Sequence, residues 1–255
     1  MKTLSKIGMA LIAILMGTII TSCSKDENHS EKKLVKFENE TSTYTFSYDG
    51  KGKLSKVTED SRDNNGTRLL TYQYSWSKDM IKIDYNYIEI HGDEVYDSDY
   101  SYSLLLENGL VTNKSNVYNE YNTPFSYDSS NRFAKCDKTR TKFSATWDGD
   151  KITTMIKDWG ERIDTYTYDY DGSSCSKGHS PILASTMNLD IIFLAHPEIG
   201  GMRTTQLPSC LNLQQRPNSN SGKSTTQTYT YEFDKDGYLT QIKIDDNDII
   251  TLTWE

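Results

Sequence analysis

The sequence predicts an all-β protein: an antiparallel meander of about seven hairpins that forms one strongly twisted, curled sheet. The clearest hairpin covers residues 228–244, TYTYEFDKDGYLTQIKI, where Tyr229, Tyr231 and Phe233 alternate with polar residues at the period of a strand. The letters DKDG that follow supply turn chemistry, because Asp bonds its own backbone and Gly accepts a positive φ. The same phrase recurs along the chain, and this recurrence is what predicts the fold class.

Each clear copy has an aromatic anchor before the turn and two apolar residues, three apart, after it. The anchors and their pairs are Tyr48 with Leu54 and Val57, Tyr127 with Phe133 and Cys136, Trp147 with Ile152 and Met155, and Phe233 with Leu239 and Ile242. Residues three apart face opposite sides of an unbroken strand. Either both faces are partly buried, or a β-bulge turns both side chains inward, which is the interpretation we favour.

Weaker copies surround Trp76, Gly109 and Tyr170, and they fill the gaps between the clear ones. A sheet of so many strands must curl, close or split. We expect a curled sheet, with a two-sheet sandwich as the alternative.

An insert over residues 173–226 interrupts the hairpin that follows Tyr170. Ser180 and Pro181 suit the start of a helix, and residues 182–194 have helical apolar spacing. We expect this helix to fill the concave side of the sheet, although a buried strand over 189–194 is an alternative. Residues 216–224 are rich in Pro, Asn, Ser and Gly and are expected to form a loop.

The N-terminus reads as a secretion signal over residues 1–22. Lys2 and Lys6 precede an apolar run over residues 7–20 that is short for a membrane span. The run ends in Ile20-Thr21-Ser22-Cys23, which resembles the bacterial lipobox. The resemblance implies a lipid on Cys23, a polar tether over residues 23–33 and a single hairpin-repeat domain over residues 34–255. An ordinary signal peptide with a chance cysteine is the alternative.

The tether begins with Lys25, Asp26 and Glu27 after Ser24. This charge order resembles the surface-export signal of Bacteroidetes lipoproteins, and it implies a lipid-anchored protein of the outer membrane that is exposed on the cell surface. A generic polar linker is the alternative.

The recurring Tyr-Asp turns with a following Gly and aliphatic residue resemble the YD repeats of RHS-type proteins. They also resemble a family of Bacteroidetes lipoproteins of unknown function that is built on such hairpins. The resemblance implies architecture and location, and it carries no activity.

Catalytic and metal motifs are lacking in the sequence. The four histidines have no partner at metal-ligand spacing, and no nucleophile elbow, phosphate loop or HExxH motif is present. We therefore expect no cofactor and no metal, apart from the open alternative of a surface calcium at Asp245-Asp246-Asn247-Asp248, where a solvated turn is favoured. A net charge of −8 argues against a nucleic-acid partner.

Three cysteines remain beyond Cys23. Cys175 and Cys210 both lie in the insert of an exported chain, so we expect a disulfide between them. Cys136 occupies an apolar hairpin position and is expected to be a buried thiol.

The most favoured function is non-enzymatic binding of a glycan or a protein, with the membrane reached through the lipid on Cys23. Tyrosine-rich surfaces suit recognition, and we expect Trp76, Trp147 and Trp159 to be the first aromatics to test. A carbohydrate-active enzyme of a surface glycan-uptake system and a structural envelope protein are the alternatives. A cleft with exposed aromatics and two facing carboxylates favours the enzyme, and a flat aromatic strip favours binding.

Overall fold

The computed structural model describes residues 31–63, 66–116, 122–138, 140–217, 222–245 and 248–255. One compact unit, Lys32–Glu255, contains all the elements discussed below. The signal peptide, Cys23 and the export signal at Lys25, Asp26 and Glu27 lie outside the described residues. In the described ranges, no helix has the length and apolar character needed to cross a bilayer.

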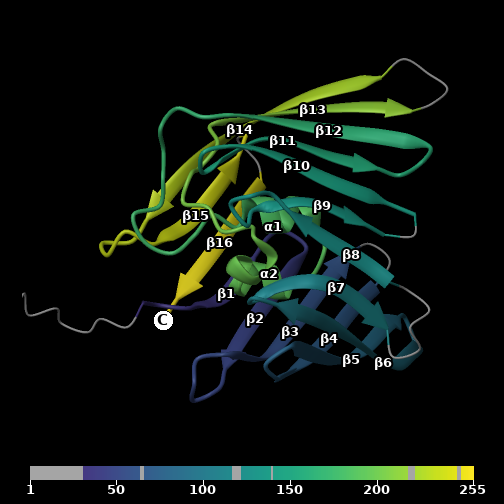
Figure 1. Ribbon diagram of the computed structural model, residues 1–255. Helices are drawn as coiled ribbons and strands as arrows, with labels where there is room; N and C mark the ends of the chain where they lie inside the picture. Colours follow the sequence, from purple (N-terminus) through teal and green to yellow (C-terminus); the bar gives the residue numbers. More distant parts are fainter. Residues whose placement is uncertain (1–30, 64–65, 117–121, 139, 218–221, 246–247) are drawn as a thin grey trace, which may run out of the picture. The chain divides into compact units, whose positions relative to one another are not determined.

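The strands of this unit form a closed antiparallel barrel in which every strand pairs with its neighbours in sequence (Figure 1). They are β1 (Leu34–Glu38), β2 (Ser42–Tyr48), β3 (Leu54–Asp63), β4 (Gly66–Trp76), β5 (Met80–His91), β6 (Glu94–Glu107), β7 (Leu110–Asn116), β8 (Asn122–Tyr127), β9 (Phe133–Asp137), β10 (Lys142–Asp148), β11 (Lys151–Asp158), β12 (Arg162–Asp169), β13 (Cys210–Pro217), β14 (Lys223–Phe233), β15 (Leu239–Ile244) and β16 (Asp248–Trp254).

The expectation of an all-β meander is confirmed, but the open curled sheet and the sandwich are both wrong, because the two ends of the chain close the barrel. β1 pairs with β16 in antiparallel register. Beside that pair, the Lys33 amide donates to the Glu255 carbonyl at 2.7 Å, and the Glu255 amide donates to Lys33 at 3.0 Å. β1 and β16 pair as the two strands of a hairpin do, although no turn connects them. The pairing leaves neither strand with an open edge.

Two strands form corners of the barrel by changing partner along their length. Residues 122–124 of β8 pair with β7, and the rest of that strand pairs with β9. Residues 223–228 of β14 pair with β13, and the remainder pairs with β15. Such corners let one continuous meander close without a flat stretch of many strands.

The β-bulge that the spacing of three predicts is confirmed. The pairing register slips by one residue opposite Tyr48, Tyr127, Trp147 and Phe233, and the extra residue follows the first apolar residue of each pair. Both members of each apolar pair are consequently buried, with exposed fractions between 0% and 4%. A fifth bulge, beside Leu106, has the same form.

The polar end of most anchor side chains binds the backbone of the preceding hairpin. The indole of Trp147 donates to the Phe133 carbonyl at 2.7 Å, and the hydroxyl of Tyr48 donates to the Leu34 carbonyl at 2.7 Å. The same bond joins Trp76 to Leu54, Tyr127 to Val111, Tyr170 to Ile152 and Trp254 to Leu239. The aromatic ring thus packs in the barrel wall while its polar atom satisfies a main-chain carbonyl.

The insert lies between β12 and β13 and contains α1 (Ile182–Met187), α2 (Ile192–Ala195) and the 3-10 helix η1 (Pro197–Gly200), as Figure 1 shows. It fills the barrel as predicted: Leu183, Ile192 and Phe193 are 0% exposed, and the Phe193 ring lies 6.0 Å from that of Phe125 in β8. The prediction of a helix rather than a strand is confirmed, although two short helices, α1 and α2, replace the single one expected.

Three details of the predicted insert are wrong. It ends before β13, so residues 210–217 and 223–226 belong to the barrel wall. Asn188 adopts a left-handed conformation with φ 46° and ends α1, which splits the expected helix. Ser180 is not the N-cap, which is Pro181; the Ser180 amide instead donates to the Thr204 carbonyl at 2.8 Å.

The two faces of the barrel wall differ in character. Apolar side chains point inward, and polar side chains alternate with them on the outside, as the period of a strand requires. On β9, Lys135 has a side chain that is 53% exposed, between the buried Phe133 and Cys136. The same exposed, polar positions occur on other strands: Lys56, Gln73, Lys82, Ser126, Thr167, Thr230 and Thr253. The outer wall in the described part of the chain is therefore mostly polar.

Candidate binding cleft

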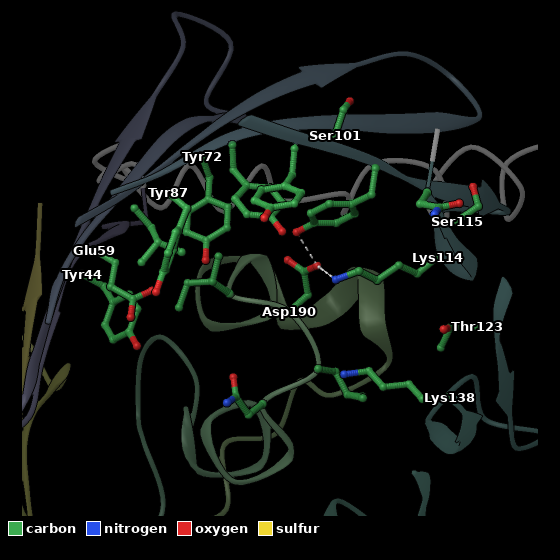
Figure 2. A pocket seen from close by; sticks show the side chains of 18 residues that line it. Tyr44, Glu59, Tyr72, Tyr87, Ser101, Lys114, Ser115, Thr123, Lys138 and Asp190 are labelled. Atoms are coloured by element: carbon green, nitrogen blue, oxygen red, sulfur yellow. Dashed lines mark hydrogen bonds and ion pairs between the residues drawn. The ribbon is translucent and has the colours of Figure 1, made fainter. Parts of the chain in front are cut away.

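A cleft of about 840 Å³ opens between β2 to β8, the residue that follows β9, and the insert (Figure 2). Its walls hold tyrosines from four strands, together with two lysines and two carboxylates. The tyrosines are Tyr44, Tyr72, Tyr85, Tyr87, Tyr100 and Tyr102, and the charged residues are Glu59, Lys114, Lys138 and Asp190. Because strand residues two apart share a face, Tyr85 and Tyr87 of β5 both line the cleft, as do Tyr100 and Tyr102 of β6.

The tyrosine rings form an ordered stack across three neighbouring strands. Tyr85 of β5 lies 5.4 Å from Tyr72 and 5.1 Å from Tyr100, with interplanar angles of 27° and 21°. Tyr102 meets the same ring edge-on at 5.9 Å. Paired rings hold one another in place, so the cleft presents a preorganised aromatic wall.

Asp190 is the centre of the polar network in the cleft. It lies between α1 and α2, and its side chain is only 1% exposed. One carboxylate oxygen accepts hydrogen bonds from the Lys114 ammonium and from the Tyr102 hydroxyl, both at 2.7 Å. Burial and the charge of Asp190 hold the pKa of Tyr102 well above its usual value, so Tyr102 remains a neutral donor.

Lys114 belongs to the hairpin pattern, although its side chain breaks the rule of apolar pairs. It lies three residues after the buried Val111, beyond the bulge, where other hairpins carry an apolar residue. Its ammonium lies 3.9 Å from the centroid of the Tyr102 ring. A lysine at that position is the one signal in the sequence that could have indicated this site.

Glu59 supplies the second carboxylate, on the part of the cleft near Tyr44 (Figure 2). Burial raises the pKa of Glu59, while a hydrogen bond with Tyr44 and the positive charge of Arg68 oppose that rise. Burial also raises the pKa of Tyr44, to about 12. Glu59 therefore holds a proton more readily than a carboxyl group in water does.

The tryptophans that the sequence suggested as ligand contacts lie outside this cleft. Trp76 and Trp147 are partly buried and use their indole nitrogens to bind backbone carbonyls. Trp159 is 43% exposed, and its indole donates to the buried Asp164 carboxylate at 3.1 Å. Tyrosines, not tryptophans, form the aromatic surface of the cleft.

The cysteines are free thiols in the structure at Cys136, Cys175 and Cys210, so the expected disulfide between Cys175 and Cys210 is not formed there. Cys136 is 0% exposed, as expected for a buried thiol. Burial raises the pKa values of Cys136 and Cys175 to about 12. Neither thiol is therefore a nucleophile at neutral pH.

The described residues contain no group of three or more side chains that could hold a metal ion. In the acidic turn considered for calcium, Asp246 and Asn247 lie outside the described residues. Asp245 accepts a hydrogen bond from the Thr228 amide at 2.8 Å, which suits the role of a turn residue.

Comparison with known proteins shows which solved structures share this fold. No protein-family model and no curated protein matches the chain. The chain is similar to the crystal structure of a porin-like protein from Bacteroides uniformis, with a TM-score of 0.58 and 15% identity over 87% of this chain and 98% of that one. The barrel has a porin-like fold. A porin-like protein from Bacteroides vulgatus matches at a TM-score of 0.48 and 14% identity, over 88% of this chain and 99% of that one.

This finding corrects the resemblance to the YD repeats of RHS-type proteins and to a Bacteroidetes lipoprotein family built on such hairpins, which is wrong. The Tyr-Asp turns belong to bulged hairpins of a closed barrel with a porin-like fold. The pairing of β1 with β16 closes that barrel. Turn chemistry and strand alternation are alike in both architectures, so the local motif could not separate them. At 15% identity the likeness shows the fold alone.

Proposed function

We propose that this protein is a lipid-anchored protein of the outer membrane, displayed on the cell surface, that binds a glycan in the tyrosine cleft without altering it. The observation that carries the proposal is the cleft of about 840 Å³ with six tyrosines in its lining. This volume lies within the range of about 300–1,000 Å³ that is usual for small-molecule sites. A concave site of this size suits a short glycan segment better than a flat protein surface.

The chemistry of tyrosine supports a sugar as the ligand. Its ring offers an apolar face to the C–H groups of a sugar, and its hydroxyl offers a hydrogen bond to the ring substituents. Only two side-chain torsions are ordered on binding, so the entropy cost is low. The stacking of Tyr72, Tyr85 and Tyr100 lowers that cost further, because the rings are already held.

The barrel wall supports attachment through the lipid rather than through the strands. Barrels that sit in lipid carry apolar side chains outside and polar ones inside, whereas most exposed positions on the described strands are polar and most buried ones are apolar. The interior is packed with α1 and α2, so we propose binding in the cleft and not passage through the barrel. A lipid on Cys23 would then supply the membrane contact.

The experiment that tests glycan binding compares Tyr85→Ala with Tyr96→Ala in the full mature protein. Tyr85 is the centre of the stack, whereas Tyr96 lies on β6 and is 53% exposed. A glycan array identifies ligands, and calorimetry measures their affinity. We expect Tyr85→Ala to weaken binding about tenfold, or about 1.4 kcal/mol, and Tyr96→Ala to leave it unchanged. A folded protein that binds no glycan, or an unaffected Tyr85→Ala variant, would contradict the proposal.

One observation favours a carbohydrate-active enzyme as the second candidate. The raised pKa of Glu59 is the property of a general acid, and Asp190 is a second carboxylate in the same cleft. Asp190, however, is already engaged by Lys114 and Tyr102. Release of reducing ends from a bound glycan, lost in Glu59→Gln, would favour the enzyme; binding without turnover favours the first candidate.

A further inference from the structure

The charged residues of the cleft are not equally satisfied by the protein. Lys114 and Asp190 form an ion pair at 2.7 Å. Glu59 has a hydrogen bond with Tyr44 and the positive charge of Arg68 nearby. Lys138, which follows β9, differs from the other three.

The Lys138 ammonium has no ion pair and no side-chain hydrogen bond with any of the described residues. The ammonium lies over the Phe143 ring, 5.5 Å from its centroid. Lys138 is partly buried, and that burial, together with the charge of Lys114, lowers its pKa, while the charge of Asp190 opposes the change. A cation that loses hydration without gaining an anion in direct contact is unfavourable, and an anion placed beside it would relieve this cost.

The two lysines act on the same part of the cleft. In Figure 2 the side chains of Lys114 and Lys138 extend into the cleft from one side, away from Glu59 and Tyr44. Asp190 contacts only Lys114 directly and acts on Lys138 from further away, so two ammonium groups share one carboxylate at this end of the cleft. The chain as a whole is acidic, with a net charge of −8. The positive end is therefore a local feature of the cleft.

We propose that the ligand of the cleft is an anionic sugar whose carboxylate or sulfate group pairs with Lys138, while its rings lie along the tyrosine stack. This inference rests on the proposed function, since it names the class of glycan that the same cleft binds. Glu59 at the other end disfavours a second anionic group there, so the ligand binds in one direction. The Lys114 ammonium, which stays ion-paired with Asp190, adds positive charge near the bound anion.

The test uses Lys138→Met in the full mature protein, with Lys135→Met as the matched control. Methionine removes the charge and keeps an unbranched side chain of similar length. Lys135 lies three residues earlier, on β9, and faces outward, paired with Asp137 at 2.7 Å. The probes are a trigalacturonate, a sulfated galactose trimer and the neutral galactose trimer, each measured by calorimetry at low and at physiological salt.

We expect the wild type to bind one of the anionic probes at least tenfold more tightly than the neutral trimer, and to lose part of this preference in salt. Lys138→Met should abolish the preference and leave the neutral affinity within about twofold, and Lys135→Met should change neither. The carboxylate and sulfate probes show which anion the site takes.

Two failures are distinguishable. If the wild type binds neutral and anionic sugars equally, the anionic ligand is wrong. If Lys138→Met keeps the preference, the pairing of the anion with Lys138 is wrong. Glycan binding stands in both cases. If none of these probes and no glycan on the array binds the folded protein, the proposed function is wrong and this inference fails with it.

Discussion

At the scale of single residues, the anchor aromatics hold the barrel through their polar ends as well as through their rings. The Tyr48 hydroxyl donates to the carbonyl of Leu34, a residue that is only 1% exposed. We predict that Tyr48→Phe lowers the free energy of unfolding by about 1–1.5 kcal/mol, because the ring stays and a single hydrogen bond is lost. Urea denaturation followed by tryptophan fluorescence measures the change.

The matched control for that change is Tyr96→Phe. Its hydroxyl donates to the exposed Glu94 side chain at 2.8 Å, so the loss should stay within about 0.5 kcal/mol. Equal losses in the two variants would show that the anchor hydroxyl has no structural role.

Single residues also mark what sequence reasoning could and could not reach. Burial of Cys136 was predictable, because the hairpin pattern alone fixes which way that side chain points. The pairing of Lys114 with Asp190 was not, because the two residues lie 76 positions apart and nothing local connects them. The cleft depends on such distant pairings, so the hairpin pattern does not indicate which tyrosines line it.

At the scale of elements, the two short helices of the insert act as the core of the barrel. Phe193 of α2 is 0% exposed and contacts the ring of Phe125 across the interior. We predict that Phe193→Ala lowers the free energy of unfolding by about 3–5 kcal/mol, since it removes apolar contacts and leaves a cavity. Thermal and urea denaturation both report this change.

Phe233→Ala is the control for the insert, because Phe233 lies on β14 and is 41% exposed. The Phe233 side chain buries less apolar surface on folding than Phe193 does. Phe233→Ala should therefore lower the free energy of unfolding by at most about 1 kcal/mol. A Phe193→Ala variant as stable as Phe233→Ala would mean that the barrel does not depend on the insert for its core.

The elements were predicted where one local rule decided them. The bulges followed from a spacing of three, and the turns from their Asp and Gly residues. The prediction that the insert lies inside the sheet is confirmed. The predicted helix is too long, since Asn188 adopts a left-handed conformation and ends α1. Helical spacing alone contains no sign of that break, which positions Asp190 at the cleft.

At the scale of the whole molecule, closure of the barrel was beyond a local reading. β1 is five residues long, and its partner β16 is the last strand of the chain. No turn joins them, so the pattern of anchor and turn that revealed the other hairpins was missing here. Trp254 nevertheless bonds to the Leu239 carbonyl at 2.7 Å, as the other anchors bond to theirs.

The polar outer wall of the barrel leads to a prediction about the whole molecule. If Cys23 carries the only membrane attachment, then a chain exported with a conventional cleavable signal in place of residues 1–22, and with Cys23→Ala, should leave the membrane fraction. It should also remain soluble without detergent, because exposed positions such as Lys56, Lys82 and Lys135 face water. Cell fractionation, with the native leader and Cys23 intact as the control, measures the distribution.

The same experiment distinguishes the two ways in which a porin-like fold could meet a membrane. A barrel held by its strands would stay in the membrane fraction after Cys23→Ala and would need detergent for extraction, whatever its leader. A barrel held by lipid alone should be released and keep its unfolding transition and its affinity for the glycan. Retention of the released variant in membranes would overturn lipid anchoring, and with it the view that the cleft is presented to solvent at the end of a tether.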